Sequence, residues 1–322
     1  MSRIRDIANI LSTSTNMATD AEVTSAISAQ FMAGKNKIIN GDFSIAQRGT
    51  TFSNPANFAY LLDRYAIYYD GTGATRTISQ QTFTPGTAPV SGYESANFFR
   101  YAQTVAGTSN TVNLIYQRIE DVRTFAGTSA VLSFWAKADT TRTVTASARQ
   151  YFGTGGSGDV NTGFTGSASL TTSWQRFSFT ISVPSISGKT IGTSSALEIQ
   201  LVLPAGTTPT IDIWGVQIES GSTATNFSLA TSSLATELIA CQRYYEKLGT
   251  VRFDTASAGD WYHSIPYKVS KRIAPVITYS FSGENNTSNA ATFIDTDGFS
   301  FVTNQSGAGY NIFTNIVMNA EL

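Results

Sequence analysis

Few residues in this sequence could carry out enzymatic chemistry. His263 is the one histidine of the chain, so a Ser-His-Asp or Cys-His site would have to use it, and zinc sites built from several histidines are excluded. Glycoside hydrolysis needs two carboxylates about 5–10 Å apart. The candidate acids are Asp42, Asp63, Glu120, Asp121, Asp212 and Glu219. Nothing in their spacing marks a pair, and the sequence predicts that the protein is not an enzyme.

Two of these aspartates lie in otherwise apolar, strand-like segments. Asp42 follows Asn40-Gly41 near the start of the β-rich region, and Asp212 lies in "TIDIWGVQI" near its end. An aspartate in a strand is unfavourable unless it is hydrogen-bonded or binds a metal. If the first and last strands pair, both carboxylates could approach one structural cation. The alternative is that they cap turns and accept hydrogen bonds at a strand edge. A third acidic segment, "DTDG" at 295–298, lacks the closing acid of a calcium loop and is read as a turn.

Aromatic residues make up 12% of the chain and suggest a second kind of site. Sugar binding uses flat aromatic faces together with amide and hydroxyl groups, because pyranose rings present both C–H patches and hydroxyls. The candidates for glycan binding are Tyr60, Tyr65, Trp135 and Trp214. Packing in a core or an interface is the alternative for each of them.

The elements that would position these residues are mostly strands. From about Ile38 to Phe227, apolar residues alternate with polar ones, and Gly, Ser and Thr lie between the runs. The clearest runs are "VLSFWAKA", "QRFSFTISV" and "LEIQLVL", and in the first of these Trp135 has the parity opposite to Phe134. In "TIDIWGVQI" the apolar parity changes, which predicts a β-bulge at Trp214-Gly215. Many short strands and few helices favour a two-sheet antiparallel sandwich.

Two segments are predicted to be helical. In the leader, "TDAE" at 19–22 reads as a capping box, and Val23 and Ile27 follow on one stripe. The second helix is predicted over residues 232–249, where Leu234, Leu238 and Tyr245 lie on a stripe with 4-3-4-3 spacing. Each stripe could pack on the rest of the chain, or it could form a seam between copies of the protein. After this helix, alternating segments such as "VITYSF" predict a second, smaller β domain.

Composition and charge limit the partners and the cellular location that can be expected for the protein. Charged residues are 13% of the chain and the net charge is −1, so nothing indicates binding to nucleic acid or to an anionic membrane. No apolar run approaches the ~18 residues of a membrane span. The first 20 residues lack the features of a signal peptide. We therefore expect that, if the protein acts outside a cell, it leaves by a route such as lysis rather than by secretion.

Taken together and in order, several motifs resemble phage virion fibre proteins, including tail fibres. The motifs are "NKIINGDFSIAQRG", "LDRYAI", "LSFWAKA", "SWQRFSFTISVP", "IDIWGVQIESG" and "LATELIACQRYYEK". The region 36–230 is similar to the jelly-roll, carbohydrate-binding-module-like domain of that group. The leader and "IPYKVSKRIAPVITYS" at 265–280 are also similar to it, so that the resemblance covers nearly the whole chain.

The resemblance implies a mainly β protein with four parts. These are a helical leader for virion attachment or trimerisation (1–35), a jelly-roll β-sandwich (36–230), a connecting helix (231–249) and a small C-terminal β domain (250–322). It implies a structural component of the particle, assembled in the host cytoplasm and exposed on the released virion. It also implies a homotrimer, with other tail or fibre proteins as partners and host polysaccharide as a ligand. It implies no cofactor, but it does imply a structural Ca²⁺, for which Asp42 and Asp212 would be ligands. A monomeric carbohydrate-binding protein and a polysaccharide depolymerase are the alternatives.

Overall fold

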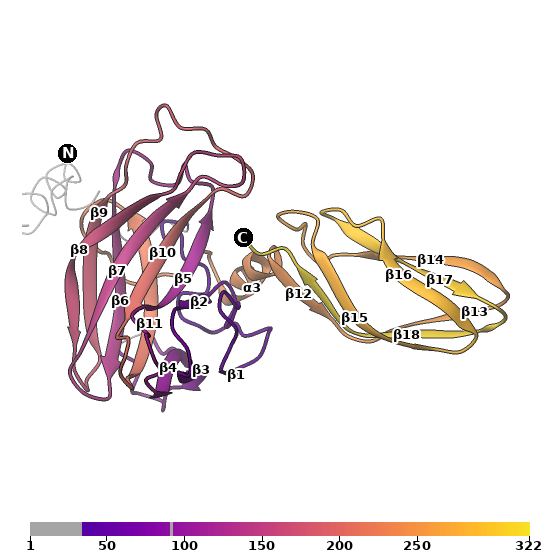
Figure 1. Cartoon of the computed structure of the whole chain (residues 1–322), viewed down its shortest axis with the longest axis horizontal. Helices are drawn as coiled ribbons and strands as arrows, with labels where there is room; N and C mark the ends of the chain where they lie inside the picture. The colour runs from indigo at the N-terminus through magenta and orange to yellow at the C-terminus, as the bar shows by residue number, and fades with distance from the viewer. Residues whose placement is uncertain (1–33, 91–92) are drawn as a thin grey trace, which may run out of the picture. The chain divides into compact units, whose positions relative to one another are not determined.

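The computed structural model describes residues 34–90 and 93–322. The predicted leader stripe, Val23 and Ile27, lies outside the described residues. Residues 34–322 form one compact unit. Within it, two large sheets lie face to face, and two smaller sheets follow one helix among the described residues (Figure 1). In this described part, no helix is long and apolar enough to cross a membrane.

The two large sheets form an antiparallel β-sandwich. The six-stranded sheet has the order β1 (Thr51–Ser53), β3 (Thr75–Thr82), β4 (Asn97–Val105), β11 (Thr210–Ser220), β6 (Ser129–Ala138) and β9 (Gln175–Ser182). The five-stranded sheet has the order β2 (Ala66–Tyr69), β5 (Asn113–Glu120), β10 (Ala196–Leu203), β7 (Arg142–Tyr151) and β8 (Val160–Leu170). Neighbours in both sheets pair antiparallel, so the predicted mainly β class is confirmed.

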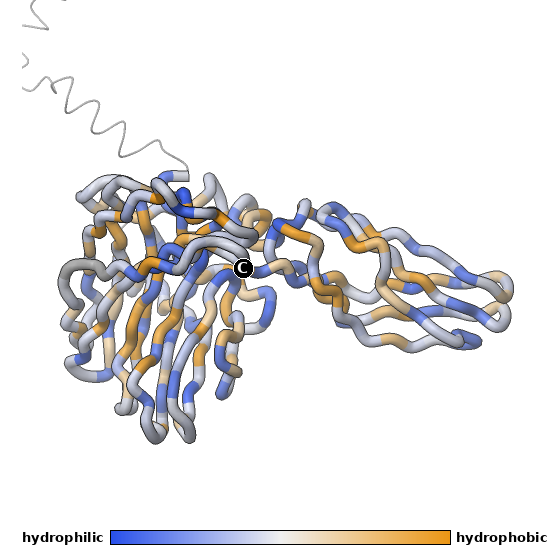
Figure 2. Tube along the Cα trace, turned by 45° about the horizontal axis from the view of Figure 1, so that its top comes forward, coloured by the Kyte–Doolittle hydropathy of each residue, from blue (hydrophilic) through white to orange (hydrophobic). Residues whose placement is uncertain are grey.

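The sandwich core follows from the period-two pattern. On β6, Leu132 and Phe134 point into the core, as Ile199 and Leu201 do on β10. Successive side chains of a strand alternate between its two faces, so every second residue of these strands is removed from water. Each such aliphatic or aromatic side chain contributes about 1.5–3 kcal/mol when fully buried. Figure 2 shows the resulting alternation of hydrophobic and hydrophilic positions along the strands.

The predicted bulge in β11 is confirmed. The pairing of β11 with β6 shifts between Trp214 and Gln217, and Gly215 has φ +65°. A side chain at Gly215 would place its Cβ 2.9 Å from Trp135 Cε3, so a glycine is needed there for space as well as for backbone conformation.

Beyond the bulge, the opening segment of the chain takes the place of β4 beside β11. Lys37 N donates to Ile218 O (3.0 Å), and Val216 N donates to Gly41 O (2.9 Å). The first and last segments of the sandwich therefore do pair. However, the regular strand predicted to begin near Ile38 is absent among the described residues, because residues 39–42 form turns and β1 begins at Thr51.

The connecting helix is shorter than predicted. Helix α3 spans Leu234–Gln242, and the N-cap Ser233 accepts a hydrogen bond from Thr236 N. The chain then enters β12 (Tyr245–Leu248), so the placement of Tyr245 on a helix is wrong. The 4-3-4-3 stripe misled because its last two members belong to a strand that pairs with β18. The buried face of α3 carries Glu237 and Cys241 instead of the leucines.

Two smaller sheets, here called the C-terminal sheets, complete the fold. In the first, β18 (Gly309–Asn319) pairs with β12, with β13 (Val251–Thr255) and with β15 (Val276–Gly283). The second has the order β14 (Gly259–Pro266), β17 (Gly298–Gln305) and β16 (Asn286–Thr292). Their own core consists of Tyr267, Phe299, Phe301, Phe313, Ile316 and Met318.

Candidate functional site

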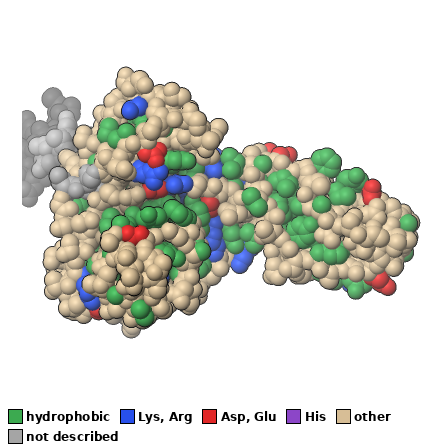
Figure 3. Space-filling model, in the orientation of Figure 1, with side chains coloured by type: hydrophobic (Ala, Val, Ile, Leu, Met, Phe, Trp, Pro, Cys, Tyr) green, Lys and Arg blue, Asp and Glu red, His purple; other side chains and the backbone are tan. Residues whose placement is uncertain are grey.

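A groove lies on the outer face of the five-stranded sheet. It has a volume of about 320 Å³. Its lining residues are Phe58, Tyr68, Leu114, Tyr116, Arg118, Arg149, Glu198 and Gln200. Figure 3 shows a hollowed band across the sandwich in which hydrophobic side chains lie beside charged ones.

The floor of the groove consists of the outward-facing residues of two neighbouring strands. Tyr116 on β5 is opposite Gln200 on β10, and Arg118 is opposite Glu198. These residues alternate with core residues such as Ile115 and Ile199, so the same periodicity that builds the core places the polar row outside.

Hydrogen bonds join the polar side chains into a row across three strands. Arg118 Nε donates to Glu198 Oε2 (2.8 Å), and Gln200 Nε2 donates to Glu198 Oε1 (2.5 Å). On β7, Ser147 Oγ donates to Gln200 Oε1 (2.5 Å). Burial disfavours the charged guanidinium, but the hydrogen bond and charge of Glu198 outweigh it and raise the pKa of Arg118. The row is therefore preorganised and presents both donors and acceptors.

Two aromatic rings form one wall. Phe58 is 58% exposed, and its ring centroid lies 5.1 Å from that of Tyr68. Phe58 has φ +64°, which is unfavourable for a bulky residue. The conformation is held because Phe58 N donates to Ile67 O (2.9 Å) on the adjacent strand. The chain thus keeps an apolar ring in water at the edge of a polar row.

The opposite wall is cationic but charge-paired. Arg149 Nε donates to Asp159 Oδ2 (2.8 Å), and the Arg149 guanidinium lies 5.4 Å from the ring centroid of Tyr151. Since Arg118 is paired with Glu198, neither guanidinium of the groove is left without a carboxylate.

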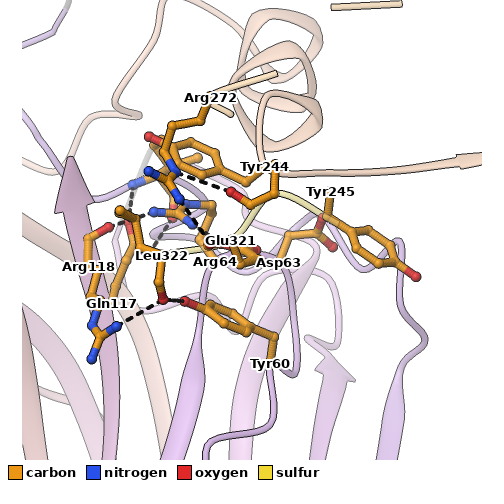
Figure 4. Close-up of polar contacts among 12 residues, drawn as sticks. Tyr60, Asp63, Arg64, Gln117, Arg118, Tyr244, Tyr245, Arg272, Glu321 and Leu322 are labelled. Carbon is orange, nitrogen blue, oxygen red and sulfur yellow. Dashed lines mark hydrogen bonds and ion pairs between the residues drawn. The ribbon is translucent and has the colours of Figure 1, made fainter. Parts of the chain in front are cut away.

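Tyr60 lies at one end of the groove and is tied to the last residues of the sequence. Its hydroxyl donates to Leu322 O (2.6 Å), which also accepts from Arg118 Nη1 (3.0 Å; Figure 4). The adjacent Glu321 pairs with Arg48 and with Arg64. Burial raises the pKa of Tyr60 above its ordinary range. Tyr60 therefore holds Leu322, and Arg48 and Arg64 hold Glu321, against the sandwich.

The structure does not bring the predicted glycan-binding residues together. Tyr65 packs in the sandwich core against Phe43. Trp135 and Trp214 do lie on the outer face of the six-stranded sheet, but segments around Phe83 and Phe227 cover them, and Trp214 is 0% exposed. A buried ring cannot stack on a sugar, so Tyr65, Trp135 and Trp214 are corrected to packing residues.

The two aspartates of the predicted cation site have separate partners. Asp212 pairs with Arg100 (Nε–Oδ1 2.6 Å), and Lys137 Nζ lies 3.7 Å from it, on the strands at either side. Asp42 accepts hydrogen bonds from Ser44 N and Oγ (3.3 and 2.7 Å), and burial raises its pKa. The residues described here contain no cluster of three or more His, Cys, Asp or Glu side chains suited to a metal. Calcium binding stays a prediction.

The residues of the predicted oligomer seam differ in exposure: two of them are exposed on α3 and one is buried on β12. Leu234 and Leu238 are 51% and 36% exposed on α3 and are accessible to a second copy. Tyr245 is buried on β12, where the Arg48 guanidinium lies 3.7 Å from its ring centroid, and it is removed from the seam.

The acids singled out from the sequence do not form a catalytic pair in the groove. Glu198 is the one carboxylate among the described lining residues, and both of its oxygens accept hydrogen bonds. Hydrolysis of a glycosidic bond requires a second carboxylate on the other side of the bond. The described lining of the groove contains no such second carboxylate.

Sequence reasoning missed most of the groove, although a signal was present. The outward parity of "NLIYQRIE" and "LEIQLVL" marks Tyr116, Arg118, Glu198 and Gln200 as a polar row opposite the core residues. Nothing local marks Phe58, because its position depends on pairing with Ile67.

Comparison with known proteins adds the following. No family model matches the chain, and no curated protein matches its sequence. Among solved structures, the enzymatically active domain of tailspike protein 4 of bacteriophage CBA120 is 17% identical with a TM-score of 0.37, covering 58% of this chain. The chain spans 22% of that tailspike domain.

Two further similar structures carry names that describe sugar binding. A xylan-binding domain from Paenibacillus barcinonensis is 17% identical with a TM-score of 0.31, covering 56% of this chain and 98% of that one. A putative sugar binding protein from Bacteroides thetaiotaomicron is 13% identical with a TM-score of 0.35. The match covers 58% of this chain and 100% of that one. At these values the similarity carries no argument about what this chain binds.

Proposed function

We propose that the sandwich binds a saccharide chain in the groove of the five-stranded sheet. The observation that carries this proposal is the pair of the exposed Phe58 ring and the half-buried Tyr68 ring beside the hydrogen-bonded row of Glu198, Gln200 and Ser147. A pyranose ring has apolar C–H patches that can pack on the rings. Its hydroxyls can exchange hydrogen bonds with the preorganised row.

The charges of the groove favour a neutral or weakly charged saccharide. Arg118 and Arg149 are both paired with carboxylates, so little positive potential is left for a phosphate backbone or a polyanion. The net charge of −1 points the same way.

A binding panel with a matched variant tests this proposal. We expect one or more of xylan, mixed-linked β-glucan, galactan, mannan and purified host surface polysaccharide to bind in isothermal titration calorimetry. Truncation of Phe58 to Ala should weaken that binding by about tenfold or more, since a buried phenyl ring contributes about 1.5–3 kcal/mol. Val105→Ala is the control, because Val105 is an exposed apolar residue on the other sheet. Equal affinities of the two variants would contradict the proposal, and release of reducing ends would favour a depolymerase.

For the whole chain, we propose a structural component of a phage particle, a trimeric tail fibre or fibre adaptor that contributes to host-surface attachment. Support comes from the order of the sequence motifs and from the exposed leucines of α3. The leader would attach the chain to other tail or fibre proteins, and the protein would be exposed on the released virion.

Two measurements test the virion proposal. Light scattering should give a mass three times the 34.5 kDa of the chain, and Leu234→Ser with Leu238→Ser should lower it. Antibody labelling of virions in electron micrographs should place the protein on the particle. A monomer at micromolar concentration with no virion label would favour the alternative, a monomeric carbohydrate-binding protein.

A further inference from the structure

The C-terminal sheets repeat a feature of the groove. Phe293 is 73% exposed, has φ +50°, and its ring centroid lies 6.1 Å from that of Tyr262, which is 60% exposed. In the sandwich, Phe58 is likewise exposed, has φ +64° and lies beside Tyr68, which is half-buried. A bulky residue with positive φ is a strained outlier. Core packing accounts for this conformation at Phe43, which has φ +58° and is buried, but Phe293 is exposed. Neither core packing nor backbone preference explains a phenyl ring held in water at such a position.

The floor beside these two rings is flat and polar. Tyr262 and Ser264 are successive outward residues of β14, and Ser264 is opposite Ser300 on β17. The two serine oxygens are 3.1 Å apart, and Thr292 on β16 is the next residue in the same row. Small hydroxyl side chains leave room for a ligand and offer it hydrogen bonds.

A cavity of about 360 Å³ lies against Phe293 and the Ser264–Ser300 pair, and Tyr262 lies two residues before Ser264 on β14. Its lining residues are Ser264, Ile265, Pro266, Phe293, Asp295, Asp297, Gly298, Phe299 and Ser300. Phe299, one of these lining residues, also belongs to the core of the C-terminal sheets.

The loop that carries Phe293 is held in shape by its own aspartates. Asp295 Oδ1 accepts from Asp297 N (2.7 Å) and from Gly298 N (2.8 Å), and these bonds lower its pKa. Asp297 Oδ1 accepts from Ser270 Oγ (2.5 Å). The "DTDG" segment is therefore a turn, as its sequence predicts. Asp295 therefore stays ionised at neutral pH, and Asp295 and Asp297 both line the cavity described above.

The charge of the cavity limits its ligand. Its described lining contains two carboxylates and no Lys, Arg or His. Polyanions such as uronic-acid polymers, phosphorylated glycans and nucleic acids would be repelled. Ionised carboxylates are strong acceptors for the hydroxyls of a neutral sugar and for the ammonium group of an amino sugar.

We propose that Phe293 and Tyr262 form a second saccharide-binding site, which takes a neutral or amino pyranose unit. The ring stacks on the two aromatic side chains, and its polar groups meet Asp295 and the Ser264–Ser300 pair. This site is separate from the groove, and it does not depend on the groove being a binding site. If both sites engage one glycan surface, binding of the second is intramolecular and the avidity exceeds either affinity.

Saturation-transfer NMR on the full-length chain tests the proposal. The probes are the methyl glycosides of glucose, galactose, mannose, N-acetylglucosamine and glucosamine, with methyl glucuronide as the anionic comparison. The Phe58→Ala background removes the aromatic wall of the groove. In that background we expect saturation transfer to the ring protons of one or more neutral or amino glycosides, and none to the glucuronide.

Phe293→Gly in the same background should weaken this binding by about tenfold or more. Because glycine adopts positive φ without strain, the melting temperature should stay equal or rise. A fall in melting temperature would instead assign Phe293 a packing role and overturn the proposal. A change in molar mass by light scattering would show that this face is an interface between copies, which would also overturn it.

The two proposals fail separately. If Phe58→Ala alone abolishes all transfer, the groove binds sugar and the second site does not exist. If Phe293→Gly alone abolishes it while Phe58→Ala has no effect, the second site stands, and the groove proposal is decided by the polysaccharide titrations. Absence of transfer to every glycoside in the wild-type chain would overturn the second site.

Discussion

Removal of the Glu321 carboxylate should destabilise the protein strongly. The Glu321 and Arg64 side chains are 4% and 1% exposed, and Glu321 also pairs with Arg48 at 3.0 Å. At the 3.0 Å that separates the charged atoms of Arg48 and Glu321, and at an effective dielectric of 20, two opposite unit charges attract by about 5.5 kcal/mol. Part of this offsets the loss of hydration, and breaking a buried pair typically costs about 3–5 kcal/mol. We expect Glu321→Ala to lower the free energy of unfolding by that amount.

The surroundings of Arg64 make relaxation difficult. Its Nη2 donates to Arg118 O (2.6 Å), and its guanidinium lies 3.4 Å from the ring centroid of Tyr244. Burial disfavours the charged form, but the charge of Glu321 outweighs it and raises the pKa of Arg64. Without Glu321, a charged guanidinium would therefore stay buried without its partner.

Urea titration followed by tryptophan fluorescence measures the effect. The matched control is Asp254→Ala, which breaks an exposed pair with Arg252, whose side chains are 70% and 57% exposed. That pair should contribute less than about 1 kcal/mol. A loss below about 1 kcal/mol for Glu321→Ala, or equal losses for the two variants, would refute the reasoning that the Arg64–Glu321 contact is buried and formed.

Three further predictions concern the opening segment. Gly41→Ala should cost about 2 kcal/mol or more in thermal melts, because its Cβ would lie 2.2 Å from Val216 O, whereas Gly249→Ala meets nothing within 4 Å and should be nearly neutral. Burial raises the pKa of Asp42 above 3.8, so its stabilising contribution is present below that pH and is lost as the pH rises through the folded-state pKa. Asp42→Asn should therefore melt higher than the wild type at about pH 7 and equally at about pH 3.5. If Asp42 holds calcium, Ca²⁺ should raise the melting temperature over that in chelator for the wild type and not for this variant; identical melts would contradict the site.

Much of the sandwich could be predicted from alternation alone. Leu132, Phe134, Ile199 and Leu201 are buried as their parity predicts, because a strand with one face on a core has little other choice. The bulge at Gly215 could be predicted for the same reason, since only an extra residue returns the apolar side chains to the core.

The helix after the sandwich shows where such reasoning fails. The 4-3-4-3 stripe predicts that Leu234 and Leu238 pack either on the chain or against a second copy, but it does not predict that Glu237 takes the buried side of α3. Its Oε1 accepts from Asn40 N (2.6 Å), and its Oε2 accepts from Thr231 N (3.0 Å). A buried acid becomes favourable when distant backbone donors satisfy it, and nothing in the local sequence shows those donors.

The opening "NGDF" shows the same division between sequence and tertiary structure. By itself the sequence determined the alternating strands of the two-sheet class, the bulge at Gly215 and the exclusion of zinc sites built from several histidines. Only the tertiary structure decided the partners, with Glu237 on Asn40 and Ser44 on Asp42. The physical reason is the distance along the chain over which each effect acts. Periodicity and turn preferences act over a few residues, whereas burial of charge and exposure of Phe58 and Phe293 depend on neighbours from other strands.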